Sequence, residues 1–180
     1  MQPRYLIRSV LFIASACFYS QCHPPTTNGN DEQQESTQDT IPLPVKTEKL
    51  GNHGKVFYID GKSILQDTLV NGDKRLRING DLFLHITGDH FPLYIYTSLM
   101  QLEVISPSAF RISAYDKDQG QSVESLSGEI RIAKNYDSPF PEPDTLRENN
   151  LYMINRSIDL SEKENLDDDK LAQWWKRVGN

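Results

Sequence analysis

The stretch Asp81–Ile86, which reads DLFLHI, decides the fold class of this chain. Its aliphatic residues Leu82, Leu84 and Ile86 fall on one face of an extended segment, while Phe83 falls on the other. Alternation with a period of two is typical of a β-strand that packs one face against a core. The same pattern returns in short apolar stretches along most of the chain after residue 50.

Ten such stretches predict ten short strands in one all-β domain. They are Val56–Ile59, Ser63–Val70, Arg75–Ile78, Asp81–Ile86, Leu93–Thr97, Leu102–Ile105, Phe110–Tyr115, Ser122–Leu126, Glu129–Ala133 and Leu151–Ile154.

Turn residues separate these stretches. Asn71-Gly72 predicts a two-residue hairpin, because both residues tolerate a positive φ. Asp60-Gly61, Asn79-Gly80 and Ser127-Gly128 predict further reversals. We therefore expect a twisted antiparallel sandwich, with a short β-solenoid as the alternative, followed by a short C-terminal helix.

The helix is predicted over Lys170–Arg177. Leu171, Trp174 and Trp175 are spaced three and four residues apart and form one apolar face. The acids at 167–169 precede the helix, where they suit its dipole. We expect the apolar face to pack on the sheet, and the alternative is that it binds a partner.

The first 21 residues resemble a secretory signal. Arg4 and Arg8 are followed by an apolar run of about 12 residues, which matches such a signal and is short for a membrane-spanning helix. An uncleaved short anchor is the alternative. Loss of residues 1–21 would remove two arginines and no acid, which changes the net charge from −6 to −8.

A cysteine at the end of such a run is typical of a bacterial lipoprotein, in which the thiol is acylated. We predict acylation at Cys22, where the apolar run meets a polar segment, with Cys17 as the second choice. Small residues before Cys17 suit a cleavage site, but the apolar run before it is short. An acyl chain would then hold the protein on a membrane.

The predicted organisation has four parts. Residues 1–21 form a lipoprotein-type signal peptide, residues 22–47 a disordered tether, residues 48–160 the β-domain and residues 161–180 a C-terminal helical tail. The tether is rich in Pro, Thr, Asn, Gln and acids and has little to bury.

Composition excludes several classes of protein. The 180 residues carry 19 Lys and Arg against 25 Asp and Glu, so a nucleic-acid binder held by phosphate contacts is disfavoured. Two cysteines near the N-terminus do not make a disulfide-stapled scaffold. One apolar stretch excludes a polytopic membrane protein.

Residues that could carry chemistry form no recognisable motif. The four histidines lack the spacing of a zinc site, and the sequence holds neither a nucleophile elbow nor a phosphate-binding loop. Carboxylate pairs such as Asp116/Asp118 and Glu142/Asp144 lie in polar loops. We predict no catalytic, cofactor-binding or metal-binding residue and no cofactor.

Four segments in order resemble the FecR domain family. Gly80–Ile86 is similar to its G-E-A-F-F-E-V strand, Pro92–Thr97 to its P-F-x-V-x-T segment, and Leu102–Tyr115 and Ser122–Ile132 to the strands that follow. The resemblance covers residues 75–132 and extends loosely to Trp175. The landmark residues are Gly80, Phe83, Pro92, Thr97, Phe110, Ala114, Tyr115 and Gly128.

This resemblance implies an anti-sigma, iron-dicitrate-type sensor regulator. Family members hold a sigma factor with a cytoplasmic segment, and their periplasmic domain reads a TonB-dependent transducer. This chain is expected to be a truncated form that lacks the sigma-binding segment. It also departs from the family at Ser106–Ser108, where a Gly-Thr turn is usual, and at Asn149-Asn150.

We therefore predict a non-catalytic exported protein of the bacterial cell envelope, periplasm-facing or an outer-membrane lipoprotein. Its partner would be a protein, such as the signalling domain of a TonB-dependent transducer, and not nucleic acid. The alternative is a structural or glycan-binding envelope lipoprotein that uses Tyr94, Tyr96 or Trp175 as a platform. An enzyme is the weakest alternative.

Overall fold

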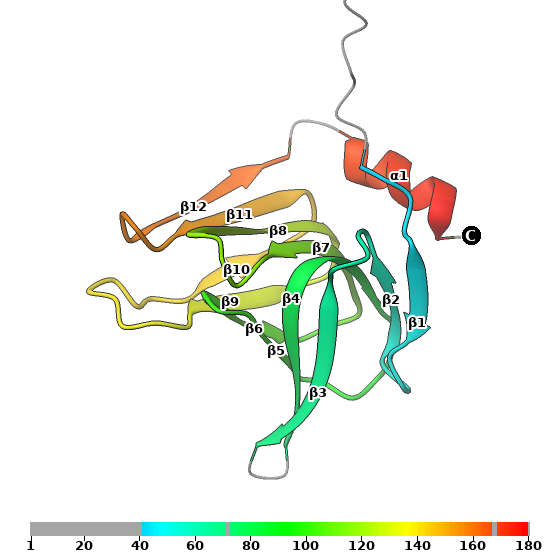
Figure 1. Cartoon of the computed structure of the whole chain (residues 1–180), viewed down its shortest axis with the longest axis horizontal. Helices are drawn as coiled ribbons and strands as arrows, with labels where there is room; N and C mark the ends of the chain where they lie inside the picture. Colours follow the sequence, from blue (N-terminus) through cyan, green and yellow to red (C-terminus); the bar gives the residue numbers. More distant parts are fainter. Residues whose placement is uncertain (1–40, 71–72, 167–168, 180) are drawn as a thin grey trace, which may run out of the picture. The chain divides into compact units, whose positions relative to one another are not determined.

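The computed structural model describes residues 41–70, 73–166 and 169–179. Within these residues the chain forms twelve strands in one sheet and a C-terminal helix (Figure 1). The elements are β1 (Lys46–Lys49), β2 (Gly54–Tyr58), β3 (Ile64–Val70), β4 (Asp73–Ile86), β5 (Leu93–Tyr96), β6 (Met100–Val104), β7 (Ser108–Ala114), β8 (Gly120–Ser127), β9 (Ile130–Lys134), β10 (Asp144–Leu146), β11 (Asn150–Asn155), β12 (Leu160–Asn165) and α1 (Lys170–Val178). The prediction of an all-β domain with a short C-terminal helix is confirmed.

The long strand β4 divides the sheet into two layers that share it. Layer 1 contains β1, β2, the C-terminal half of β4, β7, β8, β11 and β12. Layer 2 contains β3, the N-terminal half of β4, β5, β6, β9 and β10. The sheet is therefore folded on itself, and its inner surface encloses the core.

The predicted reversal at Asn79-Gly80 is wrong. Asn79 pairs with Ile64 of β3 in layer 2, and the next residue, Gly80, already pairs with Ala114 of β7 in layer 1. Gly80 has a φ of +133°, a value that favours glycine. The chain bends at Gly80 and changes layers without turning back, so two predicted strands are one strand of 14 residues.

The two-residue connection between β3 and β4 follows the predicted hairpin register, since Val70 pairs with Asp73. The turn residues Asn71 and Gly72 themselves lie outside the described residues. Asp60-Gly61 and Ser127-Gly128 connect the layers, because β2 and β8 belong to layer 1 and β3 and β9 to layer 2. β2 and β3 both run antiparallel to the single strand β4, so the reversal predicted at Asp60-Gly61 is also a bend between layers.

The sheet is mixed, whereas the sandwich that we expected first was antiparallel. β4 and β5 run parallel, with Leu76 opposite Ile95. After β4 ends in layer 1, residues 87–92 carry the chain back to layer 2. There β5 starts beside the first half of β4 and runs in the same direction.

Two strands cross the predicted domain boundaries, and a third was not predicted. β1 and the residues before it, 41–47, belong to the β-domain although they were predicted as tether. β12 places residues 161–165 in the sheet and not in the helical tail. β10 was missed because its proline-rich approach, residues 139–143, masks a strand of only three residues. The predictions for residues 1–40 lie outside the described residues.

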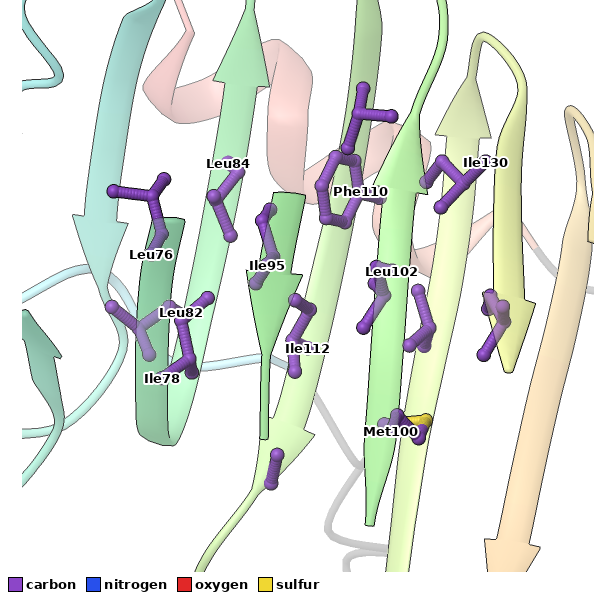
Figure 2. Close-up of a cluster of buried hydrophobic side chains, with 14 of the residues drawn as sticks. Leu76, Ile78, Leu82, Leu84, Ile95, Met100, Leu102, Phe110, Ile112 and Ile130 are labelled. Carbon is purple, nitrogen blue, oxygen red and sulfur yellow. The ribbon is translucent and has the colours of Figure 1, made fainter. Parts of the chain in front are cut away.

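The main core fills the space between the two layers. Figure 2 shows Leu82 and Leu84 of β4 and Ile95 and Leu102 of layer 2 directed into one cluster. All four side chains are fully buried. The period-two pattern of the sequence therefore identified the inner face of each long strand.

A second, aromatic cluster lies on the outer face of layer 1, between the sheet and α1. Trp174 is fully buried, and its ring centroid lies 5.0 Å from that of Phe83. Trp175 stacks on the same Phe83 ring at 4.8 Å. The prediction that the apolar face of the helix packs on the sheet is confirmed. Within the described ranges, no helix is long and apolar enough to cross a membrane.

Candidate functional site

The landmark residues Gly80, Ala114 and Tyr115 lie at the corner where β4 changes layers. A Cβ atom at Gly80 would lie 2.3 Å from Oγ of Ser63, so only glycine fits there. The Ser63 hydroxyl accepts a hydrogen bond from the Asp81 amide at 2.8 Å. These contacts hold the bend between the layers.

Asp60 completes this corner. Its carboxylate accepts hydrogen bonds from the Tyr115 hydroxyl at 2.5 Å and from the Ser63 amide at 2.8 Å. Burial acts to raise the pKa of Asp60, but these bonds outweigh it and hold the pKa below its usual value. Burial and the bond to Asp60 raise the pKa of Tyr115. The cluster is a structural anchor for the bend.

Pro92 and Thr97 bound strand β5. Pro92 follows a cis peptide bond with Phe91. The Thr97 hydroxyl accepts a hydrogen bond from the Met100 amide at 2.8 Å and donates one to Oε1 of Gln121 at 2.5 Å. Thr97 is buried and closes the β5–β6 turn.

Gly128, Phe83 and Phe110 also serve the fold. Gly128 has a φ of +91°, and a Cβ atom there would lie 2.1 Å from Oγ of Ser108. Phe110 is fully buried in the main core and Phe83 in the aromatic cluster. The landmarks therefore mark core and turn positions. The predicted acylation sites Cys22 and Cys17 lie outside the described residues.

One acid of each carboxylate pair weighed for catalysis is held in an ion pair. Asp116 pairs with Arg77 at 3.0 Å, and Asp144 pairs with Lys163 at 2.6 Å. His85 packs on Trp175 at 4.8 Å, and burial together with Lys55 lowers its pKa. Among the described residues, no three His, Cys, Asp or Glu side chains gather as metal ligands would.

A groove of about 390 Å³ lies on the outer face of layer 1. Its floor follows one register row across four strands, in which Ser113 pairs with Ser122, Ser122 with Met153 and Met153 with Glu162. We call this hollow the β12 groove. Its lining residues are Ser113, Gly120, Gln121, Ser122, Met153, Ile154, Asn155, Ile158, Leu160 and Glu162.

Exposed apolar side chains form one wall of the β12 groove. Ile158 and Leu160 are 67% and 42% exposed, and they stand where β11 turns into β12. Sequence reasoning missed both residues. The available signal was weak, because two isolated aliphatic residues in a polar segment carry no periodic pattern.

Strand β12 forms the rim of the groove and one end of the strand order. All six of its residues are exposed. Within the described part of the chain it pairs with β11 alone, so its other edge offers backbone groups to a further strand. Glu162, Lys163 and Glu164 give this edge a charged character.

A buried lysine fixes the tip of the β11–β12 hairpin. The side chain of Lys134 is only 3% exposed, and its ammonium donates to the Asp159 carboxylate at 2.9 Å and to the Ser138 hydroxyl at 3.0 Å. The Tyr136 hydroxyl donates to the same carboxylate at 2.9 Å. Asp159 has a φ of +49° in this turn. The loop after β9 thereby holds the wall of the β12 groove in place.

The hydrogen bonds in this cluster shift the pKa values of Asp159 and Tyr136. The Lys134 ammonium, with smaller help from Ser138 and Tyr136, lowers the pKa of Asp159. Burial and the bond to Asp159 raise the pKa of Tyr136 to about 12. At neutral pH Asp159 is therefore ionised and Tyr136 is neutral, which keeps both hydrogen bonds.

The residues of the predicted aromatic platform are separated. Tyr94 and Tyr96 lie half-buried on β5 in layer 2, with the Arg75 guanidinium over the Tyr96 ring at 5.1 Å. Trp175 lies in the aromatic cluster of layer 1 against Phe83. The three rings do not form one surface.

Comparison with known proteins yields structural likeness only. No protein-family model and no curated protein sequence matches the chain. Two crystal structures of a "putative anti-sigma factor" from Parabacteroides distasonis share the fold. One is 18% identical with a TM-score of 0.59 over 75% of this chain, and the other is 17% identical with a TM-score of 0.57 over 74%. This chain covers 62% of each of those chains.

Proposed function

We propose that this chain is a non-catalytic regulatory protein that acts by binding another protein through the β12 groove and its rim strand. The observation that carries the proposal is the preformed apolar wall, Ile158 and Leu160, beside an open strand edge. A partner strand can add to such an edge through backbone hydrogen bonds, while the groove accepts its side chains.

The comparisons support this class of function. The two similar structures are of an anti-sigma factor by their description, and anti-sigma factors work by protein contact. The FecR resemblance of the sequence agrees with them. We therefore propose the periplasmic signalling domain of a TonB-dependent transducer as the partner, in cell-surface signalling.

The proposed location is the bacterial cell envelope, with the chain held on a membrane by an acyl group on Cys22. Its support is the sequence pattern of residues 1–22. Palmitate labelling of the parent, Cys22→Ser and Cys17→Ser chains in the native host tests it. Loss of label in Cys22→Ser alone is expected, and an unlabelled parent chain would overturn the anchor.

The binding surface is tested with a matched pair of substitutions. Leu160→Lys places a charge in the β12 groove, and Ile64→Lys places one on the edge strand β3 of layer 2. The two side chains are 42% and 47% exposed, so their effects on folding should be similar. Binding is measured to the signalling domain of a transducer encoded beside this chain, using the full chain in non-ionic detergent.

We expect Leu160→Lys to weaken this binding by about tenfold or more, as for an apolar anchor at an interface, and Ile64→Lys to leave it unchanged. Equal binding by both variants would exclude the β12 groove as the binding surface. Failure of the parent chain to bind the domain would exclude the transducer as partner. Recovery of glycan by the parent chain would favour the ligand-binding alternative.

A further inference from the structure

The alternation of hydrogen bonds along β12 decides which of its backbone groups face the open edge. The Leu166 amide donates to the Asn149 carbonyl at 2.7 Å, and the Arg156 amide donates to the Gln119 carbonyl at 2.8 Å. In an antiparallel ladder, hydrogen-bonded pairs recur at every second residue. Given the register of β8, β11 and β12, both bonds direct the backbone groups of the even-numbered residues of β12 toward β11. The odd-numbered residues therefore direct theirs to the open edge. They are Ser161, Lys163 and Asn165.

The side of β12 that faces the β12 groove is acidic. Glu162 pairs with Met153 and lines the groove, and Glu164 follows on the same face two residues later. Both side chains are exposed. Among the described residues on this face of β7, β8, β11 and β12, Arg111 is the one cation, and it already pairs with Asp81 at 2.7 Å. The edge therefore favours a strand that brings cations to this face.

The other face of β12 carries a cation that is already paired. Lys163 is in register with Tyr152, whose side chain is buried in the main core. The Lys163 ammonium donates to the Asp144 carboxylate at 2.6 Å and to the Thr145 carbonyl at 3.3 Å, and both acceptors belong to β10. Lys163 therefore connects β12 to layer 2, and an incoming strand needs no acid to match it.

The acids also disfavour a second copy of this chain as the occupant of the edge. An antiparallel pair of β12 strands centred on Glu162, Lys163 or Glu164 places a glutamate of one copy opposite a glutamate of the other. Like charges directly opposite each other destabilise a strand pair. Charged side chains on an edge strand are a common protection against such self-association.

We propose that β12 binds an antiparallel strand that carries two cations at alternate positions, followed two residues later by an aliphatic side chain. The cations lie opposite Glu164 and Glu162. The aliphatic side chain lies opposite Leu160, on the apolar wall of the β12 groove. These three are the non-hydrogen-bonded positions of the new pair, where side chains approach most closely.

The antiparallel direction continues the pairing found between all neighbouring strands of layer 1. The inference rests on the proposed role of the β12 groove as a protein-binding surface, and it adds the charge pattern and direction of the partner strand.

Amide hydrogen exchange tests the open edge in the full chain, in non-ionic detergent. We expect the amides of Glu162 and Glu164 to exchange about tenfold more slowly than those on the open side, since only the former are bonded within the sheet. The open-side amides are those of Ser161, Lys163 and Asn165. Equal exchange rates in the two sets would overturn the assignment of the edge.

Three peptides test the pattern of the partner strand. TKTKTIT matches the edge in the antiparallel direction, TETETIT carries the opposite charge, and TITKTKT has the composition of the first in reverse order. In NMR titrations at low salt, we expect TKTKTIT to shift the amides of Ser161, Lys163 and Asn165. It should bind about tenfold more tightly than TETETIT and several-fold more tightly than TITKTKT.

Three results would contradict the pattern. The absence of amide shifts with TKTKTIT would overturn the proposal as a whole. Equal binding of TETETIT would overturn the role of the two glutamates. Equal binding of TITKTKT would show attraction by charge alone and would overturn the direction and register.

Reversing the charge of the edge provides a matched test. Glu162→Lys/Glu164→Lys should reverse the preference, so that TETETIT binds about tenfold more tightly than TKTKTIT. Asp89→Lys/Asp118→Lys changes the net charge by the same amount at exposed positions outside the β12 groove, and it should keep the preference of the parent chain. An unchanged preference in the first variant, or a reversed preference in the second, would overturn the proposal.

These results are independent of binding to a transducer domain. A chain that binds TKTKTIT as expected, but not the transducer domain, keeps its strand specificity and loses only the proposed partner. A chain that binds the transducer domain, but shows no amide shifts with TKTKTIT, contradicts the strand pattern alone.

Discussion

The outer face of layer 1 has two parts that differ in what covers them. Under α1 the strands present Phe57, Phe83 and Ala109, which are buried with Trp174. Over β7, β8, β11 and β12 the same face carries serine and methionine. The apolar wall of the β12 groove, Ile158 and Leu160, is exposed there. Both parts belong to one sheet, so the sheet alone does not decide which part is a core.

The difference shows how a small domain combines stability with an open surface. The covered part gains apolar burial from the two tryptophans and from Ile41, which packs against the same cluster. The hydrogen bond from Trp174 to the carbonyl of Pro42 fixes this segment on the helix. The open part is held instead by polar bonds around Lys134 and by the pairing of Lys163 with Asp144 across the layers. Its apolar side chains Ile158 and Leu160 therefore stay exposed.

The largest expected effect on stability comes from Trp174→Ala in the covered part. Removing a fully buried aromatic side chain should lower the free energy of unfolding by about 3–5 kcal/mol. Urea denaturation measures it, with the exposed Gln173→Ala on the same helix as the control. A change below about 1 kcal/mol would mean that the aromatic cluster adds little to stability.

The bend that separates the layers gives the next largest effect. Gly80→Ala places a Cβ atom against Ser63 at a φ of +133°, which should cost about 1–3 kcal/mol. Gly61→Ala is the control, because a Cβ atom there meets nothing within 4 Å. Equal stability of the two variants in urea denaturation would contradict the close contact at the corner.

The polar support of the open part should make its stability depend on pH. The pKa of Asp159 is lower in the folded state than its unfolded value of about 3.9, so its contribution is present above about pH 4 and is lost as pH falls through the folded value. Asp159→Asn should therefore lower the urea midpoint at pH 7, and the difference from the parent should narrow as pH falls below about 4. Asp137 is an exposed acid in the neighbouring loop. The urea midpoint of Asp137→Asn should differ little from that of the parent at any pH.

The smallest expected effect lies in the β12 groove itself. Leu160→Lys should change the free energy of unfolding by no more than about 0.5 kcal/mol, because its side chain is already 42% exposed. Leu171→Ala in the covered part should cost about 2–5 kcal/mol. Comparable losses in thermal or urea unfolding would remove the distinction between the two parts.

Periodicity predicted most of the strands and the helix, since buried positions alternate in β5, β6 and β8. It misread Asn79-Gly80, because the same dipeptide suits a hairpin and a strand that bends into a second layer. It also missed β1 and β10, which are short and partly exposed. Short edge strands bury too few side chains to leave a pattern.

The candidate site was largely hidden from sequence reasoning. The landmark residues were found, but their roles are in turns and core. Ile158, Leu160 and Met153 come together because the register pairs β12 with β11, and Lys134 reaches Asp159 across 25 positions of sequence. Neither pairing follows from local pattern.

The sequence by itself determined the all-β class, the inner faces of the long strands and the amphipathic helix, because these depend on local alternation of apolar and polar residues. The tertiary structure alone decided that β4 serves two layers, that β5 lies parallel to it, and that α1 covers one half of an outer face and leaves the other open. Those features depend on contacts between residues distant in sequence, and on the single position, Gly80, whose missing Cβ atom lets the chain change layers.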